Sequence, residues 1–249
     1  MEWYIYVLVV VVGILAGFIN TIAGSGSLLT LPLLMFLGLP AVSANGTNRV
    51  GILFQTIVST GSFRKQKVFN IRESVWLTVP AVLGSLLGAL IATDMNEEVM
   101  EKVIAGLLIL MFFIILIRPS KWIESREGNP PLPYWLRFVV FFLIGIYGGF
   151  IQAGVGFFLL AGLVLGSGFD LVKANAIKSF VILFFTLIAL AVFILNGQVH
   201  FLTGLILAAG NMIGAYFAAK YSVKWGPKVI RYFLLMILLL SSVKLLNIF

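Results

Sequence analysis

Ten apolar segments dominate the chain and limit it to a fold made of membrane-spanning helices. These segments cover residues 4–22, 27–38, 42–62, 75–93, 99–117, 134–152, 156–167, 171–195, 201–219 and 228–247. A transmembrane helix needs about 20 apolar residues, and most of the segments have that length. Charged residues form only 10% of the 249, too few to cover a soluble globule. The sequence therefore predicts an all-α, polytopic transmembrane helical bundle in the cell membrane.

Composition removes several classes of function. The net charge is +8, but the cations lie in short loops between apolar segments, which indicates membrane orientation rather than nucleic-acid binding. No cysteine is present, so thiol catalysis and iron–sulfur clusters are excluded. A single histidine, His200, argues against a histidine metal site and is interpreted as interfacial, with proton coupling as the alternative. We expect no cofactor and no metal.

The second half of the chain repeats the first. The strings GILAGFIN, AGSG and SANGTNR (13–20, 23–26, 43–49) correspond to GIYGGFIQ, AGVG and KANAIKS (145–152, 153–156, 173–179), and GSLLGALIA (84–92) corresponds to GNMIGAYFA (210–218). Four ordered blocks at nearly constant offset predict a duplication. We expect a first transmembrane repeat over 1–118, a cytoplasmic linker over 119–133 and a second transmembrane repeat over 134–249.

The distribution of charge predicts how the halves are oriented. Segments 64–72, 118–137 and 220–231 each carry four Lys or Arg residues, whereas 94–102 is acidic and 196–199 is uncharged. If all ten segments cross, every basic loop falls on the cytoplasmic side. Five crossings per half is an odd number, so the halves would be inverted, as in many secondary transporters.

Two of the segments are short for a membrane-spanning helix, and whether they cross fully or are re-entrant stays open. Residues 27–38 and 156–167 would each span roughly 18 Å as helix, against a hydrocarbon core of about 30 Å. We expect each of them to be part of a broken or re-entrant helix.

A glycine-rich break precedes each short segment, AGSGS at 23–27 and AGVG at 153–156. Glycine interrupts a helix at low cost, and the helix that follows presents unpaired N–H groups to an anion. The candidate residues at the breaks are Gly24, Ser25, Gly26, Ser27, Gly154 and Gly156. The alternative is that the glycines only allow close helix packing, which is our interpretation of Gly13/Gly17, Gly145/Gly149, Gly84/Gly88 and Gly210/Gly214.

Arg49 and Lys178 are the two cations that we place deep inside apolar segments. All nine acidic residues fall at termini, in loops or at helix ends, so no buried carboxylate is expected to neutralise these cations. Intramembrane cations are candidates for a functional site. The alternatives are snorkelling to an interface and pairing with carbonyl groups at a helix break.

Polar side chains near the breaks complete the candidate site. They are Asn20, Asn45, Thr47, Asn48 and Gln55 in the first half, and Gln152, Asn175 and Ser179 in the second. Such groups can donate hydrogen bonds to an oxyanion. They can also bond between helices or, for Asn45 and Asn175, cap helix starts.

These residues resemble the sulfite exporter TauE/SafE-like family of membrane transporters. The resemblance rests on GFINTIAGSGSLLTLPLLMFLGLPAVSANGTNRVG (17–51) and its weaker copy GGFIQAGVGFFLLAGLVLGSGFDLVKANAIKS (148–179). The second copy departs at Gly162, where the first has Pro32, and at Phe169-Asp170, where the first has Leu39-Pro40. The resemblance implies transport of sulfite or organosulfur anions such as sulfonates.

We therefore predict a secondary carrier for a small anion that works by alternating access. A passive anion channel is the main alternative. A non-transporting scaffold and an intramembrane hydrolase that uses Ser25 are weaker alternatives, because nucleophilic catalysis needs a base and His200 is predicted far from Ser25. The expected partners are the small anion and the lipid bilayer; a coupling proton or ion and a homo-oligomer stay open.

Overall fold

The computed structural model describes residues 3–117 and 131–245, and these residues form an all-helical bundle without strands. The helices are α1 (Trp3–Ala23), α2 (Ser27–Phe36), α3 (Ala41–Lys65), α4 (Ile71–Thr93), α5 (Glu97–Ile117), α6 (Tyr134–Phe150), α7 (Val155–Ala161), a π-helical turn η1 (Gly162–Gly166), α8 (Leu171–Leu195) and α9 (Phe201–Leu245). This confirms the all-α prediction. Most of the predicted linker lies outside the described residues.

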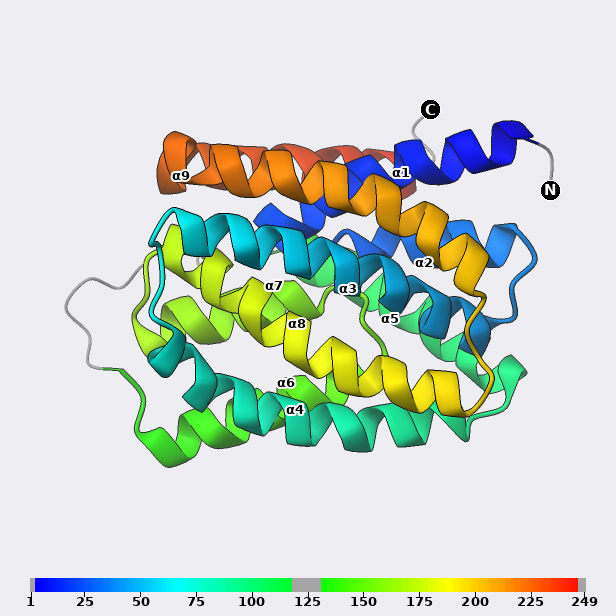
Figure 1. Ribbon diagram of the computed structural model, residues 1–249, viewed down its shortest axis with the longest axis horizontal. Coiled ribbons are helices and arrows are strands. Elements are labelled where there is room, and N and C mark those ends of the chain that lie inside the picture. The colour runs from blue at the N-terminus through cyan, green and yellow to red at the C-terminus, as the bar shows by residue number, and fades with distance from the viewer. Residues whose placement is uncertain (1–2, 118–130, 246–249) are drawn as a thin grey trace.

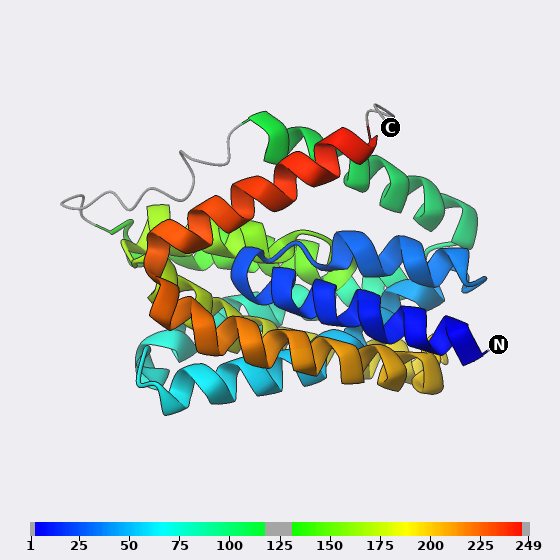
Figure 2. The same cartoon turned by 90° about the horizontal axis from the view of Figure 1, so that it is seen from above.

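Among the described residues, four helical stretches are long and apolar enough to cross a membrane: Trp3–Ala23, Ile71–Thr93, Leu171–Leu195 and Phe201–Ser222. In Figure 1, α3, α4, α8 and the first part of α9 run along the length of the molecule. The two last predicted segments, 201–219 and 228–247, belong to the single helix α9, which changes direction sharply in Figure 2. Its second part lies beside α5.

The helices α1 and α2 form a hairpin, and α6 and α7 form another. Figures 1 and 2 show the two hairpins entering the bundle from opposite ends and turning back inside it. Both turns use a glycine in the left-handed region, Gly24 with φ 77° and Gly154 with φ 71°, a conformation that costs glycine little. The short segments after the breaks therefore turn back inside the bundle, while the inversion of the two halves stays a prediction.

The tips of the two hairpins touch. A Cβ atom added at Gly24 would overlap the backbone of Gly156, and one added at Gly156 would overlap the backbone of Gly24. Only residues without a side chain allow this approach, so both glycines are needed for the contact.

The other glycine pairs pack helices of one half against helices of the other. A Cβ atom at Gly17 would overlap the backbone of Asn211, so α1 lies directly on α9. In the same way a Cβ atom at Gly149 would overlap the backbone of Ser85, and one at Gly88 would overlap the carbonyl of Ile146, so α6 lies directly on α4. The packing interpretation of these glycines is confirmed, and each half holds the hairpin of the other.

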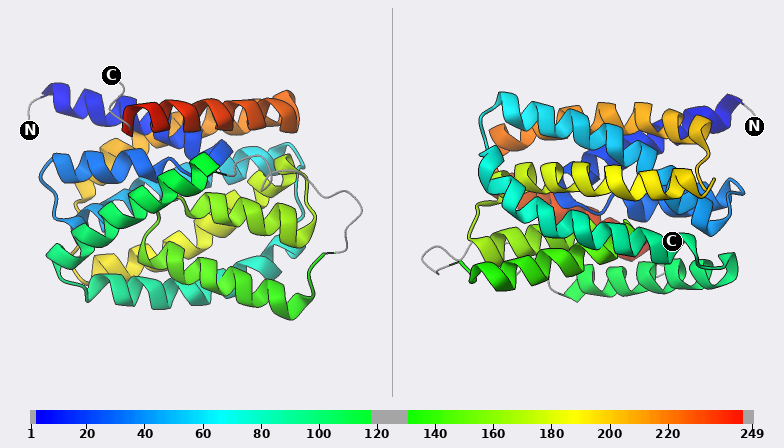
Figure 3. Two further views of the ribbon diagram at one scale, coloured as in Figure 1. Left: turned by 180° about the vertical axis from the view of Figure 1, so that it is seen from behind. Right: turned by 60° about the horizontal axis from the view of Figure 1, so that its bottom comes forward.

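The loops sort to two ends of the bundle. Loops 66–70 and 167–170 and the bend of α9 lie at one end, and loops 94–96 and 196–200 lie at the opposite end (Figures 1 and 3). Two of the three basic segments, 64–72 and 220–231, thus share an end within the described part of the chain, as the orientation rule predicts. Which end faces the cytoplasm stays a prediction from the charges.

Candidate functional site

The candidate site lies where the two hairpin tips meet, and most of its residues on α3 and α8 come from the first third of each helix. Residues of both halves are brought together there, and their side chains are almost completely withdrawn from the surface. Exposure is 6% or less for Asn20, Ser25, Ser27, Asn45, Asn48, Arg49, Gln55, Gln152, Asn175 and Lys178. Within the part of the chain whose burial is described, Arg49 and Lys178 are the only buried charged side chains.

Arg49 on α3 caps the end of α6. Its two terminal nitrogens donate to the carbonyl oxygens of Gly148 at 3.0 Å and Gly149 at 2.6 Å. Longer contacts of 3.5 Å and 3.4 Å reach the side-chain oxygens of Gln152 and Asn45. The last carbonyls of a helix have no partner within the helix and carry partial negative charge, so a cation stabilises this end.

Lys178 on α8 caps the end of α1 in the same way that Arg49 caps α6. Its Nζ donates to the carbonyl oxygens of Asn20 at 3.0 Å and Thr21 at 2.8 Å, and to Oδ1 of Asn175 at 2.7 Å. Each half thus sends one cation to the hairpin of the other half. Both cations therefore pair with carbonyl groups at a helix break, which was one of the two alternatives to a functional role.

The charges at the tips do not cancel. A helix C-terminus is equivalent to about −0.5 of an elementary charge, so the two capped ends together bring about −1 against two cations. No buried carboxylate accompanies them in the described ranges. The starts of α2 and α7 add partial positive charge at the same tips, so the centre of the bundle is left positive overall, which suits a small anion.

Further side chains link each tip to the helices around it. Asn20 donates from Nδ2 to Oε1 of Gln55 at 3.2 Å in the first half, and Gln152 donates from Nε2 to Oγ1 of Thr186 at 2.6 Å in the second. The hydroxyl of Tyr147 donates to the carbonyl of residue 153 at 2.6 Å, which holds the second turn. The two tips are therefore fixed by matched contacts.

Two candidates make contacts away from the tips. Thr47 accepts a hydrogen bond from the backbone N–H of His200 at 2.9 Å, which ties α3 to the start of α9. Ser179 donates to the carbonyl of Asn175 on its own helix at 3.0 Å. These bonds do not connect either hydroxyl group to the hairpin tips.

Four buried polar groups around the tips lack a hydrogen-bond partner. They are Oγ of Ser27, Nδ2 of Asn48, Nε of Arg49 and Nδ2 of Asn175. All four can donate a hydrogen bond, and they come from both halves. Buried polar groups are nearly always satisfied in proteins, so each of these unpaired donors is a candidate for a bond to an acceptor that the chain itself does not supply.

Comparison with known proteins decides the family. The chain matches the family described as Sulfite exporter TauE/SafE over residues 9–245. It belongs to this family. The chain is 28% identical over 247 residues to the "Probable membrane transporter protein ORF9" of Sinorhizobium sp, which covers 99% of this chain and 94% of the relative. It is 30% identical over 237 residues to the "Probable membrane transporter protein YfcA" of Escherichia coli K12, with 94% and 87% covered.

A third relative has a name of the same kind as the first two. The "Probable membrane transporter protein" of Haemophilus influenzae is 30% identical over 221 residues, which is 88% of this chain and 86% of the relative. No solved structure matches the chain. The resemblance inferred from the two motifs is confirmed, and the protein is a membrane transporter of the TauE/SafE family.

Sequence reasoning missed two hydroxyl groups in this TauE/SafE site. Thr30 on α2 donates to Oδ1 of Asn48 at 2.6 Å, and Thr186 accepts from Gln152. A signal was available for Thr186, because it is the only polar residue in the apolar stretch 180–195. The acceptors of Arg49 and Lys178 are backbone carbonyl groups, which no side chain in the sequence reveals.

The geometry of this family member also bears on Ser25 and His200. Ser25 lies in the buried tip, with 6% of its surface exposed. His200 immediately precedes α9, at an end of the bundle in Figure 1, and its side chain is exposed. No hydrogen bond joins His200 to Ser25 in the described part of the chain, so the arrangement does not favour a serine hydrolase.

Proposed function

We propose that the chain is a multi-pass secondary carrier of the cell membrane that moves a small anion by alternating access. The substrate class is sulfite or an organosulfur oxyanion such as a sulfonate. The observation that carries this proposal is the group of four buried, unpaired donors at the junction of the hairpin tips. The family description, which names sulfite export, supports the choice of anion.

The roles of the residues follow from their contacts. Ser27, Asn48 and Asn175 would donate directly to the anion oxygens, because their donor atoms have no other partner. Arg49 would add its Nε, while its terminal nitrogens continue to hold the end of α6. Lys178 would act through its charge and through its hold on α1. Such donors recognise an oxyanion without needing a metal or a second substrate.

Transport then requires that the tips separate from one another. Gly24 and Gly156 are in backbone contact, which leaves no passage between the tips. In the proposed cycle one hairpin at a time shifts along the helix that it packs on, α9 or α4, and exposes the bound anion to one side of the membrane. A coupling proton or ion would supply the driving force.

Flux into proteoliposomes tests the function. Purified protein is reconstituted, and uptake of sulfite, sulfonates, thiosulfate and carboxylates is followed with and without an imposed ion gradient. We expect saturable, gradient-dependent accumulation of a sulfur oxyanion. Flux that never exceeds equilibration would support the channel alternative, and no flux of any anion would contradict the proposal.

The exchange Asn48→Asp tests the site. It keeps the Oδ1 atom that accepts from Thr30 but replaces the unpaired Nδ2 donor by an acceptor. We expect KM for the anion to rise at least about tenfold, because one hydrogen bond to a charged group is worth about 1.5–3 kcal/mol. The matched control is Asn70→Asp, because Asn70 caps α4 as an acceptor only and lies at the surface. Equal flux in both variants would argue against Asn48 as a ligand.

A further inference from the structure

A cavity of about 760 Å³ lies away from the hairpin tips, at the first turns of α4 and α6. Five of its eight lining residues are aromatic, namely Trp76, Tyr134, Trp135, Phe138 and Phe169. Trp76 and Trp135 are 76% and 68% exposed, so the cavity opens at the outer side of the bundle. Trp and Tyr at this level of a membrane protein lie where the lipid headgroups are.

Arg137 is the cation of this cavity. Its guanidinium lies 4.3 Å from the ring centre of Tyr134, and its Nε is buried without a hydrogen-bond partner. No carboxylate of residues 3–117 or 131–245 forms an ion pair with it. A guanidinium held by an aromatic ring beside a cavity presents a planar pair of donors, the geometry that phosphate accepts.

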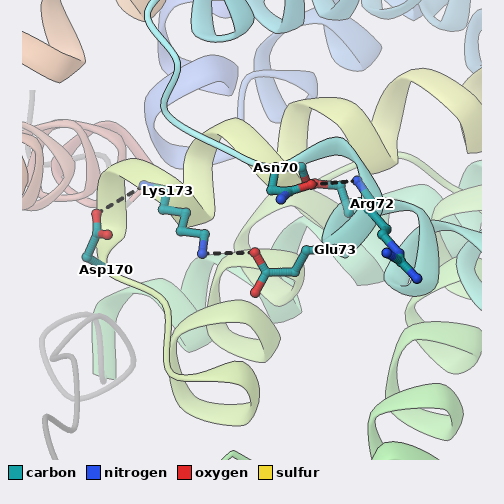
Figure 4. Close-up of polar contacts among 6 residues, drawn as sticks. Asn70, Arg72, Glu73, Asp170 and Lys173 are labelled. Atoms are coloured by element: carbon teal, nitrogen blue, oxygen red, sulfur yellow. Dashed lines mark hydrogen bonds and ion pairs between the residues drawn. The ribbon is translucent and has the colours of Figure 1, made fainter.

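The acidic groups nearby are already engaged, as Figure 4 shows. The carboxylate of Glu73, which also lines the cavity, forms an ion pair with Nζ of Lys173 at 2.9 Å. Asp170 accepts from the backbone N–H of Lys173 at 3.0 Å and caps α8. Among the residues that the structure describes, no nearby acidic group is therefore left to pair with Arg137.

Apolar side chains continue from the cavity along the outside of the bundle. On α4 the exposed residues Val79 and Leu83 follow Trp76 at helical spacing, and on α6 the exposed Val139 and Leu143 follow Trp135 in the same way. A headgroup site that opens onto such a strip matches a lipid, because the acyl chains have an apolar surface to cover.

We propose that this cavity binds the headgroup of an anionic membrane phospholipid, with its phosphate on Arg137 and its acyl chains along α4 and α6. The site is separate from the hairpin tips and does not depend on what the protein transports. An anionic headgroup such as phosphatidylglycerol is favoured over phosphatidylcholine, because it brings no cation of its own next to Arg137.

The test measures lipid binding to the delipidated, full-length protein. Phosphatidylglycerol or phosphatidylcholine is titrated in detergent, and bound lipid is counted by native mass spectrometry alongside the thermal midpoint of unfolding. We expect Arg137→Gln to weaken phosphatidylglycerol binding roughly tenfold, the loss of one charge-assisted contact. The control is Arg72→Gln, an exposed cation that does not line the cavity and whose side chain points away from the Glu73–Lys173 pair in Figure 4.

Several results would overturn the site. Unchanged phosphatidylglycerol binding in Arg137→Gln would do so, and so would an equal loss in Arg72→Gln, which would indicate diffuse attraction by surface charge. A fall in the thermal midpoint of Arg137→Gln that is the same in both lipids would assign Arg137 to a contact within the chain. If that variant does not fold, Arg137→Lys keeps the charge without the planar fork and is expected to bind phosphatidylglycerol more weakly than the wild type.

Discussion

Replacing Lys178 by methionine is expected to abolish transport and to lower the free energy of unfolding by about 2–3 kcal/mol. Methionine has a similar length and remains compatible with the buried position, but it cannot donate a hydrogen bond. Three oxygen atoms, on Asn20, Thr21 and Asn175, would lose the Nζ that they share. A buried group left without its partner costs about 1–3 kcal/mol. The end of α1, and with it the first hairpin tip, would lose its fixed position.

The thermal midpoint in detergent and anion flux in proteoliposomes measure the two effects separately. Lys65→Met is the control, because Lys65 is exposed at the end of α3. Wild-type stability in Lys178→Met would contradict the capping role of this lysine. Lowered stability with undiminished flux would show that Lys178 holds the tip but does not contribute charge to the substrate site.

The second large effect is expected for Gly156→Ala. The new methyl group would overlap the Cα atom of Gly24, and backbone atoms cannot move aside as the end of a flexible side chain can. Overpacking of this kind costs about 1–3 kcal/mol. The tips would be forced apart, so we expect flux to fall at least about tenfold along with the loss of stability.

Gly61→Ala provides a matched comparison for this substitution. Gly61 is also helical, but no atom lies within 4 Å of an added Cβ there. Since alanine favours a helix over glycine by about 0.5–1 kcal/mol, this variant should be slightly more stable than the wild type and should transport normally. If Gly156→Ala behaved like Gly61→Ala, the contact between the tips would have no part in transport.

Much of the bundle could be predicted from the sequence, because the signals were local. Apolar runs between polar loops predicted the helices, and the repeated glycines predicted close helix contacts. The partners of those glycines could not be predicted, since a glycine such as Gly17 or Gly149 indicates a close approach without indicating to what. The continuity of α9 was also missed, because the cluster of basic residues at 220–231 is typical of a loop but does not prevent a helix.

The residues of the candidate site could be predicted from the sequence, but their hydrogen-bond partners could not. The breaks and the two cations stood out in the sequence, and both cations are indeed buried at the junction of the hairpins. Their acceptors are backbone carbonyl groups of the opposite half, which every residue possesses and no pattern singles out. Arg49 and Lys178 are also one position out of register between the repeats, so the repeat alone could not reveal that they have the same task.

The exchange of hairpins between the halves has a consequence for how such a chain could arise. In each half, the first helix packs on a long helix of the other half through glycines, α1 on α9 and α6 on α4. A single half on its own would leave both of these surfaces open to lipid and would have its buried cation without the carbonyl groups that receive it. Two copies together would complete both sets of contacts. An unduplicated ancestor of this chain is therefore expected to have been stable only as a pair of subunits, which gene fusion later made inseparable.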